Sequence, residues 1–122
     1  MTKRLIEFVE LGGYPDLSPV YQELGYTVET LYTPRKAVAA IKKSQPDVIV
    51  GEFNFQNEFR DRIGNLESVI AAVAHADDVR IIVLYQPRES EIFEKFRERF
   101  PAIEAVAQPI DIEKIRSLLI AN

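Results

Sequence analysis

Short apolar runs alternate along the chain with segments that have helical spacing. Each run has the length of a strand, and two of them show no polar alternation, which is typical of strands buried on both faces of a parallel sheet. The pattern therefore predicts five strands, of which the third and fourth are the fully buried ones. They lie at 5–11, 27–31, 48–53, 79–85 and 103–107.

Five further segments place apolar residues three and four positions apart, as on one face of a helix. The five stripes are Leu17, Val20, Tyr21 and Leu24; Ala37, Val38 and Ile41; Leu66, Val69, Ile70 and Val73; Ile92, Phe93, Phe96 and Phe100; and Ile112, Ile115, Leu118 and Leu119. Gly25 is a stop signal, and Thr33 before Pro34 is a predicted N-cap. Asn65 and Asp111 are two further predicted N-caps.

Strands that alternate with helices predict a parallel sheet that is covered on both faces. Right-handed crossovers and a length of 122 residues favour the flavodoxin-like strand order 2-1-3-4-5. No repeat, linker or low-complexity tract interrupts residues 1–122. The sequence thus predicts one α/β domain, a doubly wound five-stranded parallel sheet with five helices. A site in such a sheet lies beyond the C-terminal strand ends, where we expect Glu10, Glu52, Tyr85 and Gln108.

Composition limits the class of protein. The chain is 47% hydrophobic and 28% charged, which is typical of a soluble globular protein, and it has no cysteine for a disulfide or a thiolate metal site. Its net charge of −4 argues against nucleic acid as the main ligand. No apolar run approaches the length of a membrane span, and Glu7 and Glu10 interrupt the N-terminal run, so it is a poor signal peptide. We therefore expect a cytoplasmic protein that contacts neither nucleic acid nor a membrane.

Catalytic residues do not stand out in the sequence. No serine has a neighbouring histidine and acid, so a nucleophile with its base is missing from the pattern. We expect no enzymatic activity.

Over essentially the whole chain, the pattern resembles the receiver domain of bacterial two-component response regulators. The segments that carry the resemblance are "KRLIEFVEL", "GYTVETLYTPRKAVAAIKKSQPDVIVGEFNF", "VRIIVLYQ" and "AVAQPIDIEKIRSLL". The spacing Q-P-D-V-I-V-x-E before Glu52 is the most specific part. The resemblance implies the fold described above and a role in phosphorelay signalling.

The resemblance also implies a degenerate phosphorylation site. Glu52 falls at the position of the phospho-acceptor aspartate, and the acidic pair of the first strand falls on Val9 and Glu10. Tyr85 replaces the hydroxyl residue that ends the fourth strand, and Gln108 replaces the lysine before the proline. The chain therefore resembles a pseudo-receiver. Only two carboxylates remain for magnesium, which prefers several oxygen ligands in octahedral geometry, so we expect no cofactor beyond weakly bound magnesium.

Three interpretations of Glu52 remain open at this point. It is a solvated acid at a strand end, a fixed negative charge that mimics a phosphorylated receiver, or a true acceptor. Glu10 is interpreted as a remnant of the acidic pocket. Gly12 and Gly13 lack the spacing of a phosphate-binding loop and predict an ordinary turn.

Two classes of function fit these observations. The first is a stand-alone receiver-like signalling domain that contacts a protein partner and is not phosphorylated. In the receiver family the usual contact face comprises the fourth helix, fifth strand and fifth helix, which here carry Glu91, Lys95, Glu98, Ala105 and Glu113. Ala105 also replaces the aromatic residue that the family uses as a switch. The alternatives are a binder of a small ligand or nucleotide in the crevice at the C-terminal strand ends, and an atypical receiver that is phosphorylated.

Overall fold

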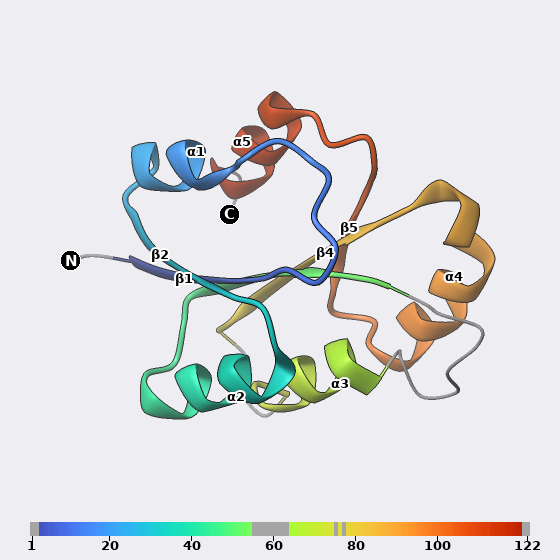
Figure 1. The fold of residues 1–122 in the computed structure, drawn as a ribbon, viewed down its shortest axis with the longest axis horizontal. Coiled ribbons are helices and arrows are strands. Elements are labelled where there is room, and N and C mark those ends of the chain that lie inside the picture. Colours follow the sequence, from blue (N-terminus) through green and yellow to red (C-terminus); the bar gives the residue numbers. More distant parts are fainter. Residues whose placement is uncertain (1–2, 55–63, 75, 77, 121–122) are drawn as a thin grey trace.

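The computed structural model describes residues 3–54, 64–74, 76 and 78–120. Five parallel strands form one sheet in the order β2-β1-β3-β4-β5, as the sequence predicts (Figure 1). The strands are β1 (Lys3–Phe8), β2 (Tyr26–Leu31), β3 (Val48–Glu52), β4 (Arg80–Tyr85) and β5 (Glu104–Ala107). All five residues of β3 are buried, in agreement with its uninterrupted apolar pattern.

Helices cover both faces of this sheet. They are α1 (Ser18–Glu23), α2 (Pro34–Lys43), α3 (Gly64–Ala71), α4 (Ser90–Arg99) and α5 (Ile112–Ile120), and a short 3-10 helix, η1 (Pro87–Glu89), precedes α4. Figure 1 shows α1 and α5 on one face and α2 and α3 on the other. In the part of the chain that the structure describes, none of the helices has the length and apolar character needed to cross a lipid bilayer.

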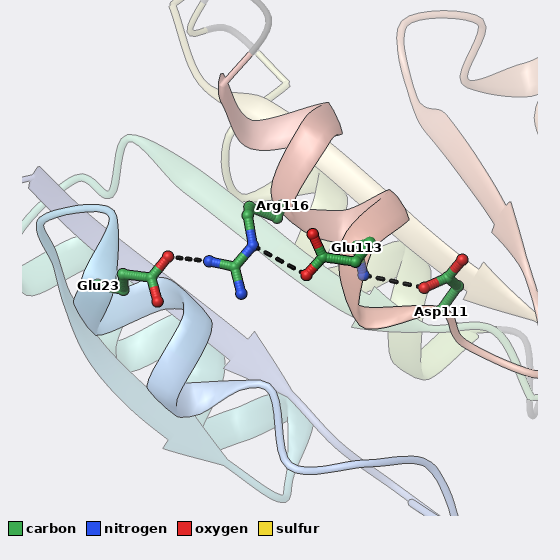
Figure 2. Close-up of polar contacts among 4 residues, drawn as sticks. All are labelled: Glu23, Asp111, Glu113 and Arg116. Carbon is green, nitrogen blue, oxygen red and sulfur yellow. Dashed lines mark hydrogen bonds and ion pairs between the residues drawn. The ribbon is translucent and has the colours of Figure 1, made fainter.

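Two of the three predicted N-caps are present. The Thr33 side chain accepts a hydrogen bond from the backbone N–H of Lys36 at 3.2 Å, and Asp111 Oδ1 accepts one from the N–H of Glu113 at 2.9 Å (Figure 2). The prediction for Asn65 is wrong, because α3 already begins at Gly64 and Asn65 lies inside its first turn. A shift of one residue is common at helix ends, where several neighbouring residues can start the helix.

The first strand is shorter than predicted. β1 ends at Phe8, although the apolar run continues to residue 11. The chain leaves the sheet after Phe8 and enters a loop in which Gly12 and Gly13 have φ angles of +72° and +86°, which a strand does not adopt. Glu10 therefore does not end the strand as predicted but lies in the loop after it, and Leu11 is 69% exposed.

Two apolar clusters lie on the two sides of the sheet. The cluster next to α2, α3 and α4 contains the rings of Phe53, Phe93 and Phe96, all of them buried. Phe53 packs edge-on against Phe93 with ring centres 5.1 Å apart. The other cluster contains Tyr21 of α1 and Ile115 of α5. Both faces of the sheet thus have a core, as a doubly wound fold requires.

An ionic contact connects α1 with α5 on the outside of the second cluster. Figure 2 shows Arg116 of α5 between Glu23, the last residue of α1, and Glu113. The distance from Arg116 Nε to Glu113 Oε2 is 3.1 Å. Pairs of this kind at a surface contribute about 0–1 kcal/mol each. Their main consequence is that Glu113, one of the candidate contact residues, already has a partner within its own helix.

Candidate functional site

The carboxylate of Glu52 is enclosed by the loop that joins β1 to α1. Glu52 ends β3 and is 2% exposed. Its Oε1 accepts hydrogen bonds from the backbone N–H groups of Glu10 at 3.2 Å and of Leu11 at 2.5 Å. Its Oε2 accepts one from the N–H of Gly12 at 2.9 Å. The interpretation of Glu52 as a solvated strand-end acid is therefore wrong, because backbone amides have replaced water around it.

The glycine pair makes this enclosure possible. Consecutive backbone N–H groups that point to one spot form a nest, a concave site that binds anions. Here the chain can fold back over Glu52 because Gly12 and Gly13 both take positive φ angles, which residues with a Cβ rarely adopt. The predicted turn at these glycines is present, but it also supplies a receptor for a carboxylate. The sequence offered no signal for that second role.

Tyr14 of the same loop is close enough to Glu52 for the two side chains to interact electrostatically. Burial raises the pKa of Tyr14 above its usual range, and the negative charges of Glu52 and Glu7 raise it further. The phenol therefore stays protonated. Backbone dipoles from the loop are directed at the carboxylate.

The residues at this site do not fit a magnesium ion. Both Glu52 oxygens already accept backbone hydrogen bonds, and Val9 has no oxygen in its side chain. Across residues 3–54, 64–74, 76 and 78–120 there is no group of three acidic or histidine side chains placed to hold a metal. Magnesium requires several carboxylate or carbonyl oxygens around it. Here backbone N–H groups of the loop point at the Glu52 carboxylate, where a magnesium ion would have to bind.

The two remaining strand-end residues take part in other contacts. Tyr85 ends β4, and its ring stacks on Phe93 with the centres 4.3 Å apart and the planes 10° from parallel. Gln108 follows β5, and its side-chain oxygen accepts a hydrogen bond from Gln86 at 3.2 Å. Glu52 and Gln108 line the same hollow, but its volume of about 30 Å³ is far below that of a ligand pocket.

A second buried carboxylate, Glu7 of β1, escaped the sequence analysis. Glu7 is 6% exposed and accepts a hydrogen bond from the Thr30 hydroxyl at 3.0 Å. Burial raises the pKa of Glu7, the hydrogen bond from Thr30 opposes this shift, and the negative charge of Asp16 adds to it. The signal in the sequence is an acid within an apolar run, a pattern that also argues against a signal peptide.

The raised pKa of Glu7 makes the stability of the fold depend on pH. A group with a raised pKa in the folded protein stabilises it most at low pH, and this stabilisation is lost as pH rises from the ordinary value of 4.5 through the raised value. We expect Glu7→Gln to unfold at a higher urea concentration than the wild type at about pH 8, and at nearly the same concentration at about pH 4. Urea unfolding across this range measures the effect.

Glu91→Gln is the control for this experiment because Glu91 is exposed on α4. Tyr14, Tyr21 and Asp16 also interact electrostatically with Glu7 or with one another. A pH dependence that is the same in Glu7→Gln as in the wild type would contradict its assignment to Glu7.

The candidate contact residues lie on or near the surface. Glu91, Lys95 and Glu98 are exposed on α4, and Glu113 is exposed on α5. Ala105 of β5 is half-buried and packs against the cluster that contains the phenylalanine rings. Because the side chain of Ala105 is a methyl group, this position has no aromatic ring that could move between a buried and an exposed orientation.

Comparison with known proteins agrees with the fold. No protein-family model and no curated protein matches the sequence. Among solved structures, the chemotaxis protein CheY4 of Vibrio cholerae is similar with a TM-score of 0.73 and 20% identity, over 98% of each chain. A response regulator protein from Burkholderia multivorans has a TM-score of 0.71 and 18% identity, over 98% of this chain and 94% of that one. A two component transcriptional regulator AraC from Clostridium phytofermentans has a TM-score of 0.69 and 17% identity, over 98% and 90%. With the strand order and the helices described above, these similarities show that the chain has the fold of a response-regulator receiver domain.

Proposed function

We propose that this chain is a receiver-like signalling domain of the cytoplasm that acts through contact with another protein, is not phosphorylated and catalyses no reaction. The observation that supports this function best is the enclosure of Glu52 by the loop amides. Neither nucleic acid nor a membrane is part of the proposal, given the net charge of −4.

Phosphoryl transfer to a carboxylate needs a free oxygen in line with the donor, with the developing charge offset by a metal and a cation. Glu52 is buried, and both of its oxygens are occupied. The position of the family's lysine holds Gln108, which is bonded to Gln86. A donor molecule would have to displace the loop before it reached the carboxylate, and it would then find no cation at Gln108.

The same arrangement favours a domain with one conformational state. A negative charge at the acceptor position is present without modification, and the loop amides are bonded to it directly. Ala105 lacks the ring of the family's switch residue. We therefore propose that the domain presents a constant surface to its partner, which includes the exposed residues Glu91, Lys95 and Glu98 of α4.

Incubation with acetyl phosphate is expected to leave the intact mass of the protein unchanged. Glu52→Asp should be equally unreactive, because the lysine, the hydroxyl residue and one acid would still be missing. The loss of one electrostatic donor lowers a rate by about 10²–10³, and the lysine that would supply such a donor is absent. A receiver domain with a complete acidic site, treated in parallel, controls for the reagent. A gain of one phosphoryl group on the unmodified chain would instead support the atypical phosphorylatable receiver.

Magnesium is expected to bind more weakly than about 1 mM, because the carboxylate it would need is already bonded to backbone amides. The measurement is a titration with magnesium chloride that follows the amide shifts of Glu10 and Glu52. Potassium chloride at the same ionic strength controls for screening. Saturable changes at these two amides below millimolar magnesium would contradict the expectation.

A second candidate function is a small-ligand binder at the C-terminal strand ends. A hollow of about 430 Å³ lies there, lined by Gln86, Gln108 and the prolines Pro15, Pro87 and Pro109, among others. Among the residues that the structure describes, its lining carries no charged side chain, so it suits an uncharged ligand better than a nucleotide, whose phosphates need cations or amide donors. The visible absorption spectrum of the protein purified from its own cells would reveal a bound flavin or cobalamin, and we expect none.

A further inference from the structure

We propose that the groove between α2 and α3 is a second contact surface, which receives an acidic amphipathic helix of the protein partner. This inference rests on the proposed function, contact with another protein, and adds a surface and the chemistry that the partner must carry. Figure 1 shows α2 and α3 together on one face of the sheet. The groove has a volume of about 480 Å³ and is lined by Pro34, Arg35, Val38, Ala39, Lys42 and Ser68.

Four of these residues form one stripe along α2. Arg35, Val38, Ala39 and Lys42 occupy positions i, i+3, i+4 and i+7 of the helix, which share one face. The two cations are therefore about 10 Å apart along the helix axis, with a patch of small apolar side chains between them. A partner helix docks on a stripe of this kind with apolar anchors in the middle and charged residues at the edges.

This stripe is separate from the face of α2 that packs on the sheet. Ala37 and Ile41 are buried in the core, whereas Val38, which the sequence pattern groups with them, is only half-buried. Among the described residues, Val38 belongs to neither of the two apolar clusters, and Ala39 is exposed. The apolar part of the groove is therefore accessible to another molecule.

The cations of the stripe have no acidic partner within the described part of the chain. No carboxylate there lies within ion-pair distance of Arg35 or Lys42. α2 carries four basic residues and no acid, although the net charge of the chain is −4. Arg35 and Lys36 also lie in the first turn of α2, where a cation opposes the helix dipole. Departures from local rules of this kind are expected at functional sites, and a carboxylate bound beside Arg35 would offset this one.

An acidic helix fits this surface better than other occupants do. A second copy of the chain that docked symmetrically through α2 would bring Arg35 against the Lys42 or the Arg35 of the other copy, so that like charges would meet. The phosphates of DNA would pair with the cations but leave Val38 and Ala39 uncovered, and these side chains are too small to insert into a lipid surface. A helix with a glutamate on each side of two leucines matches both the charges and the apolar patch.

The test is an NMR titration of the ¹⁵N-labelled full chain with a helical peptide of alanine and glutamine that carries Glu-x-x-Leu-Leu-x-x-Glu at its centre. A length of about 17 residues allows such a peptide to form a helix. We expect saturable shift changes at the amides of the groove residues Arg35, Val38, Ala39, Lys42 and Ser68. Glutamine in place of both glutamates should weaken binding about fivefold, the effect of two surface ion pairs. Serine in place of both leucines should weaken it at least about tenfold, because the apolar contact is lost.

Two double variants are matched controls within α2 itself. Arg35→Gln together with Lys42→Gln removes both cations of the stripe and should weaken binding of the glutamate peptide about fivefold. Lys36→Gln together with Lys43→Gln removes the same charge from the same helix, at exposed positions that are turned away from the stripe by about 100°. The second double variant should change the affinity by less than about twofold.

Equal losses in the two double variants, equal binding of the glutamine peptide, or no saturable shifts in the groove would overturn the proposal. So would tighter binding at the same amides to a short DNA duplex or to vesicles of anionic lipid than to the glutamate peptide, which would assign the stripe to that other class of partner. A phosphoryl group found on the chain would refute the proposed function while leaving peptide binding intact, so the two failures are distinguishable.

Discussion

Replacing Glu52 with alanine is expected to lower the free energy of unfolding by about 3 kcal/mol. The substitution removes the common acceptor of the N–H groups of Glu10, Leu11 and Gly12. A hydrogen bond to a charged group contributes about 1.5–3 kcal/mol, but the loss is below the sum of three because the loop can open and bind water. Glu52→Gln should cost less than the alanine variant, since its amide oxygen can still accept a hydrogen bond. Urea unfolding measures both values.

The control for this prediction is Glu91→Ala, an exposed substitution on α4 that should change the stability by less than about 0.5 kcal/mol. Amide shifts of residues 10–12 provide an independent measurement, because these N–H groups should move toward the shifts of solvent-exposed amides in Glu52→Ala. A loss as small as that of Glu91→Ala would mean that the loop amides bond equally well to water, and it would remove the main support for a sealed acceptor position.

Phe93→Ala is expected to have the largest effect on stability, a loss of about 3–5 kcal/mol. Phe93 is fully buried and contacts the rings of three neighbours, Tyr85, Phe53 and Phe96. Its removal takes away the transfer free energy of the ring and leaves a cavity that the rest of the cluster fills only in part. The measurement is again urea unfolding, with near-ultraviolet circular dichroism to follow the packing of the aromatic rings.

Tyr32→Ala is the matched control because it removes an aromatic ring that is 67% exposed, and it should change the stability little. Since Phe93 lies on α4 together with Glu91, Lys95 and Glu98, its loss should also loosen the surface that we propose for the partner. A stability loss below about 1 kcal/mol would show that the ring cluster collapses into the cavity and that α4 does not depend on it.

The elements of the fold were predictable because their patterns are local. An uninterrupted apolar run such as 48–53 can be buried only where both faces are covered, and the alternation of such runs with helical stripes leaves few topologies. The prediction failed at the end of β1, where the apolar pattern continued into residues that leave the sheet. The glycines of the following loop are visible in the sequence, but the contact of this loop with Glu52, 40 residues away, is not.

The candidate site was predictable in position but not in chemistry. Glu52, Tyr85 and Gln108 lie at the strand ends where the sequence placed them. That Glu52 is buried depends on the path of a loop far from it in sequence, and no local pattern encodes such a path. Glu7 is a similar case, because an acid within an apolar run can face either a polar pocket or water, and only the packing of β1 beside Thr30 and Asp16 decides between them.

The sequence by itself determined the class of fold, the order of the strands and the two-sided core. These follow from the periodicity of apolar positions and from residue identity, which need no information about distant contacts. Only the tertiary structure decided what Glu52 does, because its role depends on three amides that a glycine turn directs at one carboxylate. Backbone N–H groups are the same in every residue except proline, so the sequence cannot show which of them will bind an anion.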